Sequence, residues 1–285
     1  MIARSRGKPR AAVAALLAAV AAAATGCGTA SAYADPPVTG GTHAPAAAAA
    51  PAAAAAPAAA AAAAAAPLPL AGETVGIDPG HNGRNHTDPS FLDRQIWNGR
   101  TPEDCDTTGT ATDGGYTEAL FNFQVAGYLR ADLVRDGARV VMTRTSNDGI
   151  GPCVNQRAAI INASHADVAV DIHADGAPSW GRGFTVLEPV ADGPNDGVIA
   201  SSARLAADVR AAMLTGTAMP VSNYDGKDGT NLRDDLAGLN LTTIPKILIE
   251  VGNMKNPADA AMLTSAAFQQ QVAGVLLRAI VMFLR

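Results

Sequence analysis

The chain has no excess of basic residues, unlike most proteins that bind nucleic acid. Its 285 residues include 21 Lys and Arg against 26 Asp and Glu, which gives a net charge of −5. Four of the basic residues, Arg4, Arg6, Lys8 and Arg10, lie at the start of the chain. Without them the balance becomes 17 − 26 = −9. An acidic chain without a basic stripe argues against nucleic acid as a partner.

The first part of the sequence also lacks an apolar run that is long enough to cross a membrane. Residues 11–24 form an apolar stretch of 14 residues, whereas a spanning helix needs ~20. The stretch follows a basic segment with no acidic residue, which is typical of a secretory signal. We therefore predict that residues 1–34 are a signal peptide, cleaved after Ala34, and that the protein is exported to the periplasm or cell wall. In the alternative route the lipobox-like sequence ending at Cys27 is lipidated, which would anchor the protein to a membrane.

Cysteine is scarce, with only Cys27, Cys105 and Cys153 in the chain. None of them belongs to a Cys-x-x-Cys pair, so a metal site made of sulfur ligands is not expected. Cys27 is removed or lipidated under either processing route. The remaining pair in an exported protein predicts a disulfide between Cys105 and Cys153, the alternative being two unrelated thiols.

Residues 35–70 contain almost no large apolar side chain and consist mainly of Ala and Pro. Repeated prolines interrupt any alanine helix, so we predict an extended, disordered linker. The remaining residues, 71–285, have a suitable length for one compact domain.

Short apolar runs alternate with amphipathic stretches along this domain. Such alternation predicts an α/β fold, a single domain with a sheet covered by helices on both faces. The strands read as apolar throughout, as expected when both faces of a sheet are buried. Strands are predicted near 74–79, 139–143, 167–173, 183–188 and 245–251, and helices at 116–136, 153–165, 199–214 and 268–284. Residues 82–115 show no clear period and read as a long loop.

Four ionisable residues lie where an α/β fold places its active site. His81, His173 and Glu250 follow or end predicted strands, and Glu118 lies in the first turn of a predicted helix. Each also has an ordinary structural explanation, such as a loop histidine or a favourable charge at a helix start. Glu118, however, is in phase with the buried side of its helix, and a buried carboxylate needs a cationic partner. Two histidines and one carboxylate form a common catalytic zinc set.

The residues in these positions resemble the zinc-dependent N-acetylmuramoyl-L-alanine amidases of the amidase-3 type. The resemblance rests on IDPGHNG at 77–83, Glu118 at a helix start, ADVAVDIHADG at 166–176 and IPKILIEVGNMKNPAD at 244–259. It extends over roughly residues 74–285 and is greatest to compact members without a separate wall-binding domain. The family fold that it implies is a mixed, mostly parallel sheet flanked by helices.

The resemblance implies a function and a role for each of the four residues. His81, Glu118 and His173 would bind one zinc ion per chain, and Glu250 would be the catalytic base. The reaction would be cleavage of the amide bond between N-acetylmuramic acid and L-alanine in peptidoglycan or its muropeptides.

Several expectations and alternatives accompany this assignment. Asp78 and Asp175 lie close in sequence to the ligands and either orient them or have surface or turn roles. We expect a monomer. The competing functions are a zinc peptidase that cuts within the stem peptide and a non-catalytic envelope-binding protein on the same fold. A non-catalytic protein of this kind would be expected to lack a metal ligand or the base. All four of these residues are present in this sequence.

Overall fold

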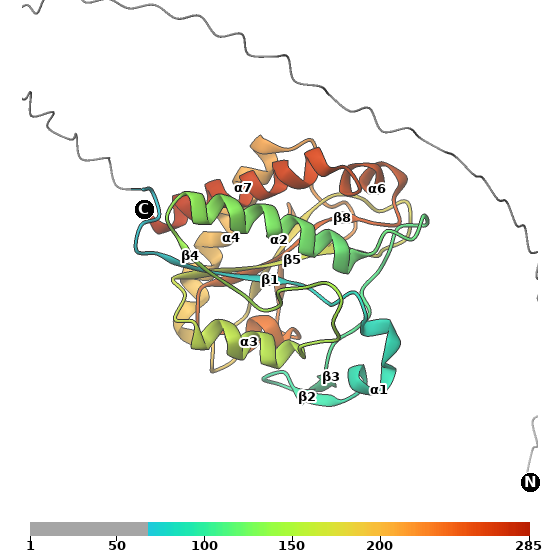
Figure 1. Cartoon of the computed structure of the whole chain (residues 1–285), viewed down its shortest axis with the longest axis horizontal. Helices are drawn as coiled ribbons and strands as arrows, with labels where there is room; N and C mark the ends of the chain where they lie inside the picture. The colour runs from blue at the N-terminus through green and yellow to red at the C-terminus, as the bar shows by residue number, and fades with distance from the viewer. Residues whose placement is uncertain (1–67) are drawn as a thin grey trace, which may run out of the picture. The chain divides into compact units, whose positions relative to one another are not determined.

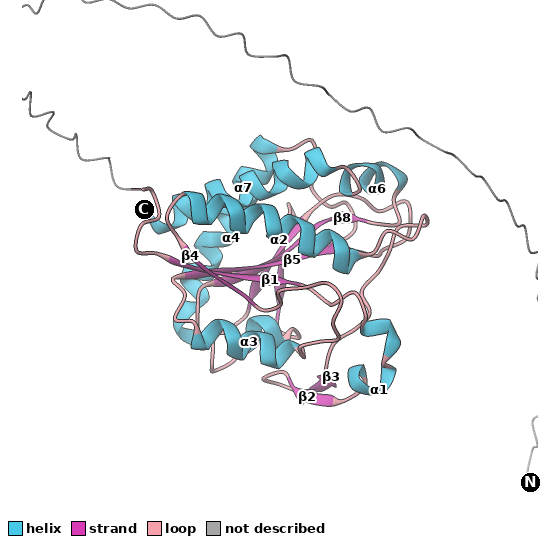
Figure 2. Cartoon of the chain, viewed as in Figure 1, coloured by secondary structure: helices cyan, strands magenta, loops and turns pink. Residues whose placement is uncertain are grey.

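The computed structural model describes residues 68–285 (Figure 1). The predicted signal peptide, Cys27 and nearly all of the predicted linker lie outside these described residues. Within them, a six-stranded sheet is flanked by helices on both faces, which confirms the predicted α/β class (Figure 2). The packed region includes Leu70, which is buried and whose backbone N–H donates to the Asp136 carbonyl.

The main sheet is mixed and mostly parallel, as the family resemblance implied. Its first four strands in spatial order run parallel to one another, and the two at the far edge are parallel to each other but antiparallel to the rest. The order is β4 (Arg139–Met142), β1 (Thr74–Pro79), β5 (Val168–Asp175), β8 (Lys246–Asn253), β6 (Thr185–Pro189) and β7 (Thr230–Arg233).

Helices cover the two faces of this sheet unequally. The long helices α2 (Glu118–Arg135), α4 (Ile199–Gly216) and α7 (Ala266–Leu284) lie together on one face, and the shorter α3 (Val154–Ala163) and α5 (Ala237–Asn240) contact each other on the opposite side (Figure 1). The remaining elements are α6 (Pro257–Leu263), α1 (Pro89–Leu92), the hairpin of β2 (Gln95–Trp97) and β3 (Pro102–Asp104), and two 3-10 turns at Asn85–Thr87 and Asp196–Val198.

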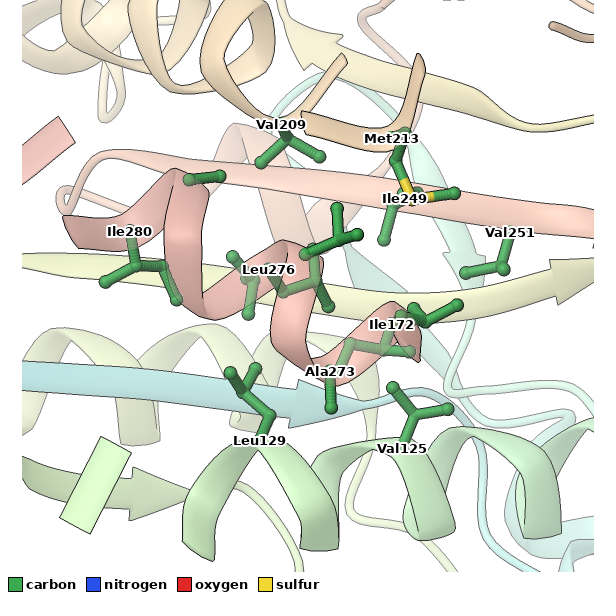
Figure 3. Close-up of a cluster of buried hydrophobic side chains, with 14 of the residues drawn as sticks. Val125, Leu129, Ile172, Val209, Met213, Ile249, Val251, Ala273, Leu276 and Ile280 are labelled. Atoms are coloured by element: carbon green, nitrogen blue, oxygen red, sulfur yellow. The ribbon is translucent and has the colours of Figure 1, made fainter. Parts of the chain in front are cut away.

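The hydrophobic core lies between the sheet and the three long helices. Alternate residues of β5, including Ile172, point into it beside Ile249 of β8 (Figure 3). Val125 and Leu129 of α2 reach the same cluster from the helix side, as expected for residues four apart on one helix face. Although α7 is long and apolar enough to cross a membrane, half of it is buried in this core.

The opposite face of the sheet carries polar side chains beside a small apolar cluster of Leu187, Leu239 and Leu248, which differs from the expectation of apolar residues throughout both faces. Because side chains alternate along a strand, the residues between the apolar ones of β5 are Asp171, His173 and Asp175. They lie in register with Asp78 of β1 and Glu250 of β8, since Asp78 pairs with Asp171 and His173 pairs with Glu250. The sheet therefore brings together charged side chains from three strands on the face away from the main core.

The predicted disulfide is confirmed. Cys105 and Cys153 are joined with an S–S distance of 2.06 Å, which ties the long segment before α2 to the start of α3. Cross-links of this span contribute ~3–4 kcal/mol to stability on the chain-entropy account. The bridge also fixes the backbone of Asp106, the residue that follows Cys105.

Candidate active site

Three side chains meet at the carboxyl edge of the central strands. Glu118 Oε1 lies 3.3 Å from His81 Nε2 and 2.8 Å from His173 Nδ1. The three residues can each offer one ligand atom, and these atoms all lie within 4.8 Å of one another. The structure thus brings together the three residues that the sequence named as metal ligands, although they are far apart along the chain.

Local structure explains how each of the three reaches this point. His81 follows β1 directly and has a left-handed backbone with φ of 57°. Glu118 is the first residue of α2, after the N-cap Thr117, and its Oε2 accepts a hydrogen bond from the Thr110 backbone at 2.9 Å. His173 lies near the end of β5 on the polar face of the sheet.

Two glycines leave the space in which these side chains meet. A Cβ atom at Gly80 would lie 2.1 Å from the His173 ring, so any side chain there would displace the ring. At Gly109, a Cβ atom would lie 2.7 Å from Glu118 Oε2 and 2.8 Å from the His81 ring. Gly109 also has a φ of 68°, a conformation that favours glycine.

The donor set fits a divalent transition metal. Ligands of a tetrahedral zinc ion at ~2.0–2.1 Å lie roughly 3.3 Å apart, close to the distances from Glu118 to the two rings. Two imidazole nitrogens and one carboxylate oxygen are also the donors that catalytic zinc sites use, with a fourth position left for water.

Glu250 lies beside these three residues on the neighbouring strand, as the register partner of His173. Its Oε2 is buried and has no hydrogen-bond partner among residues 68–285. Glu250 lines a cavity of about 470 Å³ that His81 and His173 also line. A carboxyl group that lines a cavity next to a metal site is well placed to exchange a proton with a bound molecule.

Comparison with known proteins agrees with this geometry. Residues 75–282 match the amidase-3 family, described as N-acetylmuramoyl-L-alanine amidase. The chain belongs to this family. It is 41% identical over 225 residues to the N-acetylmuramoyl-L-alanine amidase Rv3717 of Mycobacterium tuberculosis, covering 76% of this chain and 89% of that protein.

Solved structures of similar amidases show the same fold. The crystal structure of the N-acetylmuramyl-L-alanine amidase Ami1 from Mycobacterium smegmatis has a TM-score of 0.71 and 40% identity, covering 75% of this chain and 98% of that one. The apo form of Ami1 from Mycobacterium abscessus has a TM-score of 0.71 and 39% identity, covering 76% of this chain and 100% of that one. The present chain is accordingly an N-acetylmuramoyl-L-alanine amidase, a hydrolase that acts on the cell wall.

The electrostatics of the amidase site in the absence of metal follow from burial and close charges. Burial opposes protonation of His81, but the Glu118 carboxylate and the hydrogen bond to Asp106 raise its pKa to about 9. Burial works to raise the pKa of Glu118, yet the two histidines hold that pKa well below its usual value. Burial raises the pKa of Glu250 to about 8.

These shifts predict how the stability of the metal-free amidase depends on pH. Between about pH 4.5 and 8, Glu250 keeps its proton in the folded state but loses it in the unfolded chain, so stability falls as pH rises. The raised pKa of His81 acts in the same direction between about 6.5 and 9.

We therefore expect the melting temperature of metal-free protein to fall from pH 5 to pH 9. In the Glu250→Gln variant the fall should be smaller, because the Glu250 contribution is removed while the histidine contribution remains. Thermal melts of both proteins in the presence of a chelator measure this difference. Parallel pH curves for the two proteins would contradict the raised pKa of Glu250.

The two aspartates that the sequence singled out make other contacts in the structure. Asp78 is buried and contacts Thr143, Arg157 and Lys246. Asp175 accepts a hydrogen bond from the backbone of Gly176, consistent with a turn role. That either residue orients a ligand directly remains a prediction.

Sequence reasoning missed two other aspartates that do contact the rings. Asp106 Oδ1 lies 2.9 Å from His81 Nδ1, and Asp171 Oδ1 lies 3.2 Å from His173 Nε2. Asp171 could have been found, because it is two residues before His173 on the same strand and so shares its face of the sheet. Asp106 carried no such signal, since its position depends on the disulfide beside it.

Proposed function

We propose that the amidase holds one zinc ion between His81 Nε2, Glu118 and His173 Nδ1, and that Glu250 is its general base. When bound there, zinc supplies a Lewis acid that lowers the pKa of a water molecule to ~7 and polarises the amide carbonyl. The substrate bond joins the lactyl group of N-acetylmuramic acid to L-alanine of the stem peptide.

The residues of the chain then have distinct tasks. Glu250 accepts the proton of the attacking water and delivers it to the departing L-alanine nitrogen. The rings of His81 and His173 serve as neutral ligands, so protonation of either ring in acid competes with metal binding. Glu118 supplies the anionic ligand.

One observation carries this proposal. Glu250 Oε2 is buried without a partner among the described residues, and Glu250 lines the same cavity as the two proposed histidine ligands. Burying a carboxyl oxygen without a hydrogen-bond partner lowers stability, and such groups are found mainly where the chemistry of a site needs them. Proton transfer to and from a substrate in the cavity is chemistry of this kind.

The site of action follows from the family and the disulfide. A cell-wall amidase with a Cys105–Cys153 bridge belongs in an extracytoplasmic, oxidising compartment. We propose that residues 1–34 direct its export, that residues 35–70 are a linker, and that residues 71–285 act as a monomer on peptidoglycan and muropeptides. Lipidation of Cys27 is the alternative means of attachment.

The decisive experiment is digestion of muramyl dipeptide and of intact sacculi, with and without a chelator, followed by mass spectrometry. The amidase should release peptides with L-alanine amino ends and leave free lactyl groups on the glycan, and the chelator should abolish both products. A cut between amino acids would indicate a zinc peptidase instead. No product from folded, metal-loaded protein would favour a non-catalytic envelope-binding role.

A further inference from the structure

The two histidines of the metal site share an unusual environment on the side away from the metal. His81 directs Nε2 toward Glu118, and its other nitrogen faces Asp106. His173 directs Nδ1 toward Glu118, and its other nitrogen faces Asp171. Each ring therefore lies between the metal position and an outer carboxylate.

The Asp171 oxygen that faces His173 lacks a hydrogen-bond partner. Asp171 Oδ1 is buried and accepts no hydrogen bond within residues 68–285, the His173 ring included. The N–H of the His173 ring, 3.2 Å away, is the available donor. A buried acceptor of this kind gains most from a ring whose proton is on the outer nitrogen, which is the form that leaves the inner nitrogen free to bind metal.

A continuous run of buried charges joins the two outer carboxylates behind the site. Arg157 lies 3.4 Å from Asp106 and 3.1 Å from Asp78. Lys246 lies 2.8 Å from Asp78 and 3.1 Å from Asp171. All five side chains are at most 7% exposed.

The sheet fixes the geometry of this run. Asp78 and Asp171 are register partners on β1 and β5, and Lys246 pairs with Ala169 one strand further along. Backbone hydrogen bonds fix the spacing of neighbouring strands, so the backbone positions of these residues are fixed as well. Each buried charge has an opposite charge beside it, which is the condition under which buried ions are tolerated.

The charge of the run also suits a divalent cation. Three carboxylates and two cations leave one excess negative charge, and Glu118 adds a second. A bound divalent ion would offset these two charges.

We propose that Asp106 and Asp171 are positioning residues for the metal, and that Lys246 acts on the site through Asp171. Each aspartate accepts the outer N–H of its histidine, which sets the tautomer and the orientation of the ring. Lys246 holds Asp171 in place for this task. The inference rests on the proposed metal site and extends it to residues that do not touch the metal.

The test measures zinc affinity directly, by competition with a chromophoric chelator, in folded full-length variants. Asp106→Ala and Asp171→Ala should each weaken zinc binding by about 10–100-fold, the usual loss for an outer partner of a metal ligand. Asp171→Asn should restore part of this loss, because the amide oxygen still accepts the N–H. If Asp171→Ala fails to fold, Asp171→Asn decides alone: it should bind zinc severalfold more weakly than wild type, since a neutral acceptor is weaker than a charged one.

Asp259→Ala is the matched control. Asp259 is fully buried, but it accepts hydrogen bonds from the backbones of Gly183 and Asn253. Its loss should lower the melting temperature of the metal-free protein and leave zinc affinity unchanged. A merely structural role for Asp171 predicts the same pattern for Asp171→Ala.

A double-mutant cycle tests the role of Lys246. Lys246→Met should weaken zinc binding in the wild-type background but have no further effect when Asp171 is already alanine. Equal effects in both backgrounds would show that Lys246 does not act through Asp171. Unchanged zinc affinity in the aspartate variants, with zinc lost from His173→Ala, would overturn the inference and leave the metal site itself intact.

Discussion

Replacement of Glu250 by glutamine is expected to lower amide cleavage by about 10²–10⁴-fold, the contribution of a well-placed general acid–base. Glutamine has nearly the same shape as glutamate but cannot take up the proton of the attacking water. Because Glu250 is not one of the three residues that could hold the metal, bound zinc should stay at the proposed one ion per chain. Turnover of muramyl dipeptide and elemental analysis of the purified variant give the two values.

A second glutamate on the neighbouring strand provides the matched control for this variant. Glu188 of β6 is also partly buried, and burial also raises its pKa, but it does not line the cavity beside the histidines. Glu188→Gln should therefore cleave at the wild-type rate. Near-normal turnover by Glu250→Gln would remove Glu250 from the reaction.

Replacement of His173 by alanine should deplete the protein of zinc. The change removes one of the three proposed protein ligands, so zinc affinity should fall by more than the 10–100-fold, or about that, expected for an outer partner. Cleavage should fall in parallel with metal content. Elemental analysis after dialysis against a weak chelator measures the effect directly.

The exposed His165, which follows α3, offers a control with the same chemical change. His165→Ala should keep the zinc content and activity of the wild type. Zinc retained by His173→Ala at the wild-type level would contradict the ligand assignment. It would leave the family membership and the fold untouched.

Much of the fold could be predicted because its main helices and strands have a clear local pattern of apolar residues. The long helix α2 has its apolar residues on one face, and β5 and β8 are short runs rich in Val and Ile, so each was found within a few residues of its ends. The β2–β3 hairpin and β7 were missed. They are three or four residues long and polar or exposed, and their pairing depends on partners elsewhere in the fold.

The residues of the site could likewise be predicted only in part. His81, His173 and Glu250 lie at or near strand ends, and parallel strands bring such ends to one edge, so their meeting could be anticipated. The polar face of β5 was present in the alternation Asp171, His173, Asp175 but was obscured by the apolar residues between them. The position of Asp106 depends on a long loop and a disulfide, and no local pattern encodes it.

Gly80 shows that the presence of the four proposed functional residues does not by itself guarantee an enzyme. A methyl group at this position would occupy the place of the His173 ring. A relative with alanine there could retain both histidines and both glutamates in its sequence and still be unable to assemble them around a metal. Judging from sequence whether such a relative hydrolyses or merely binds the cell wall therefore requires attention to the smallest residue beside the site as well as to the reactive ones.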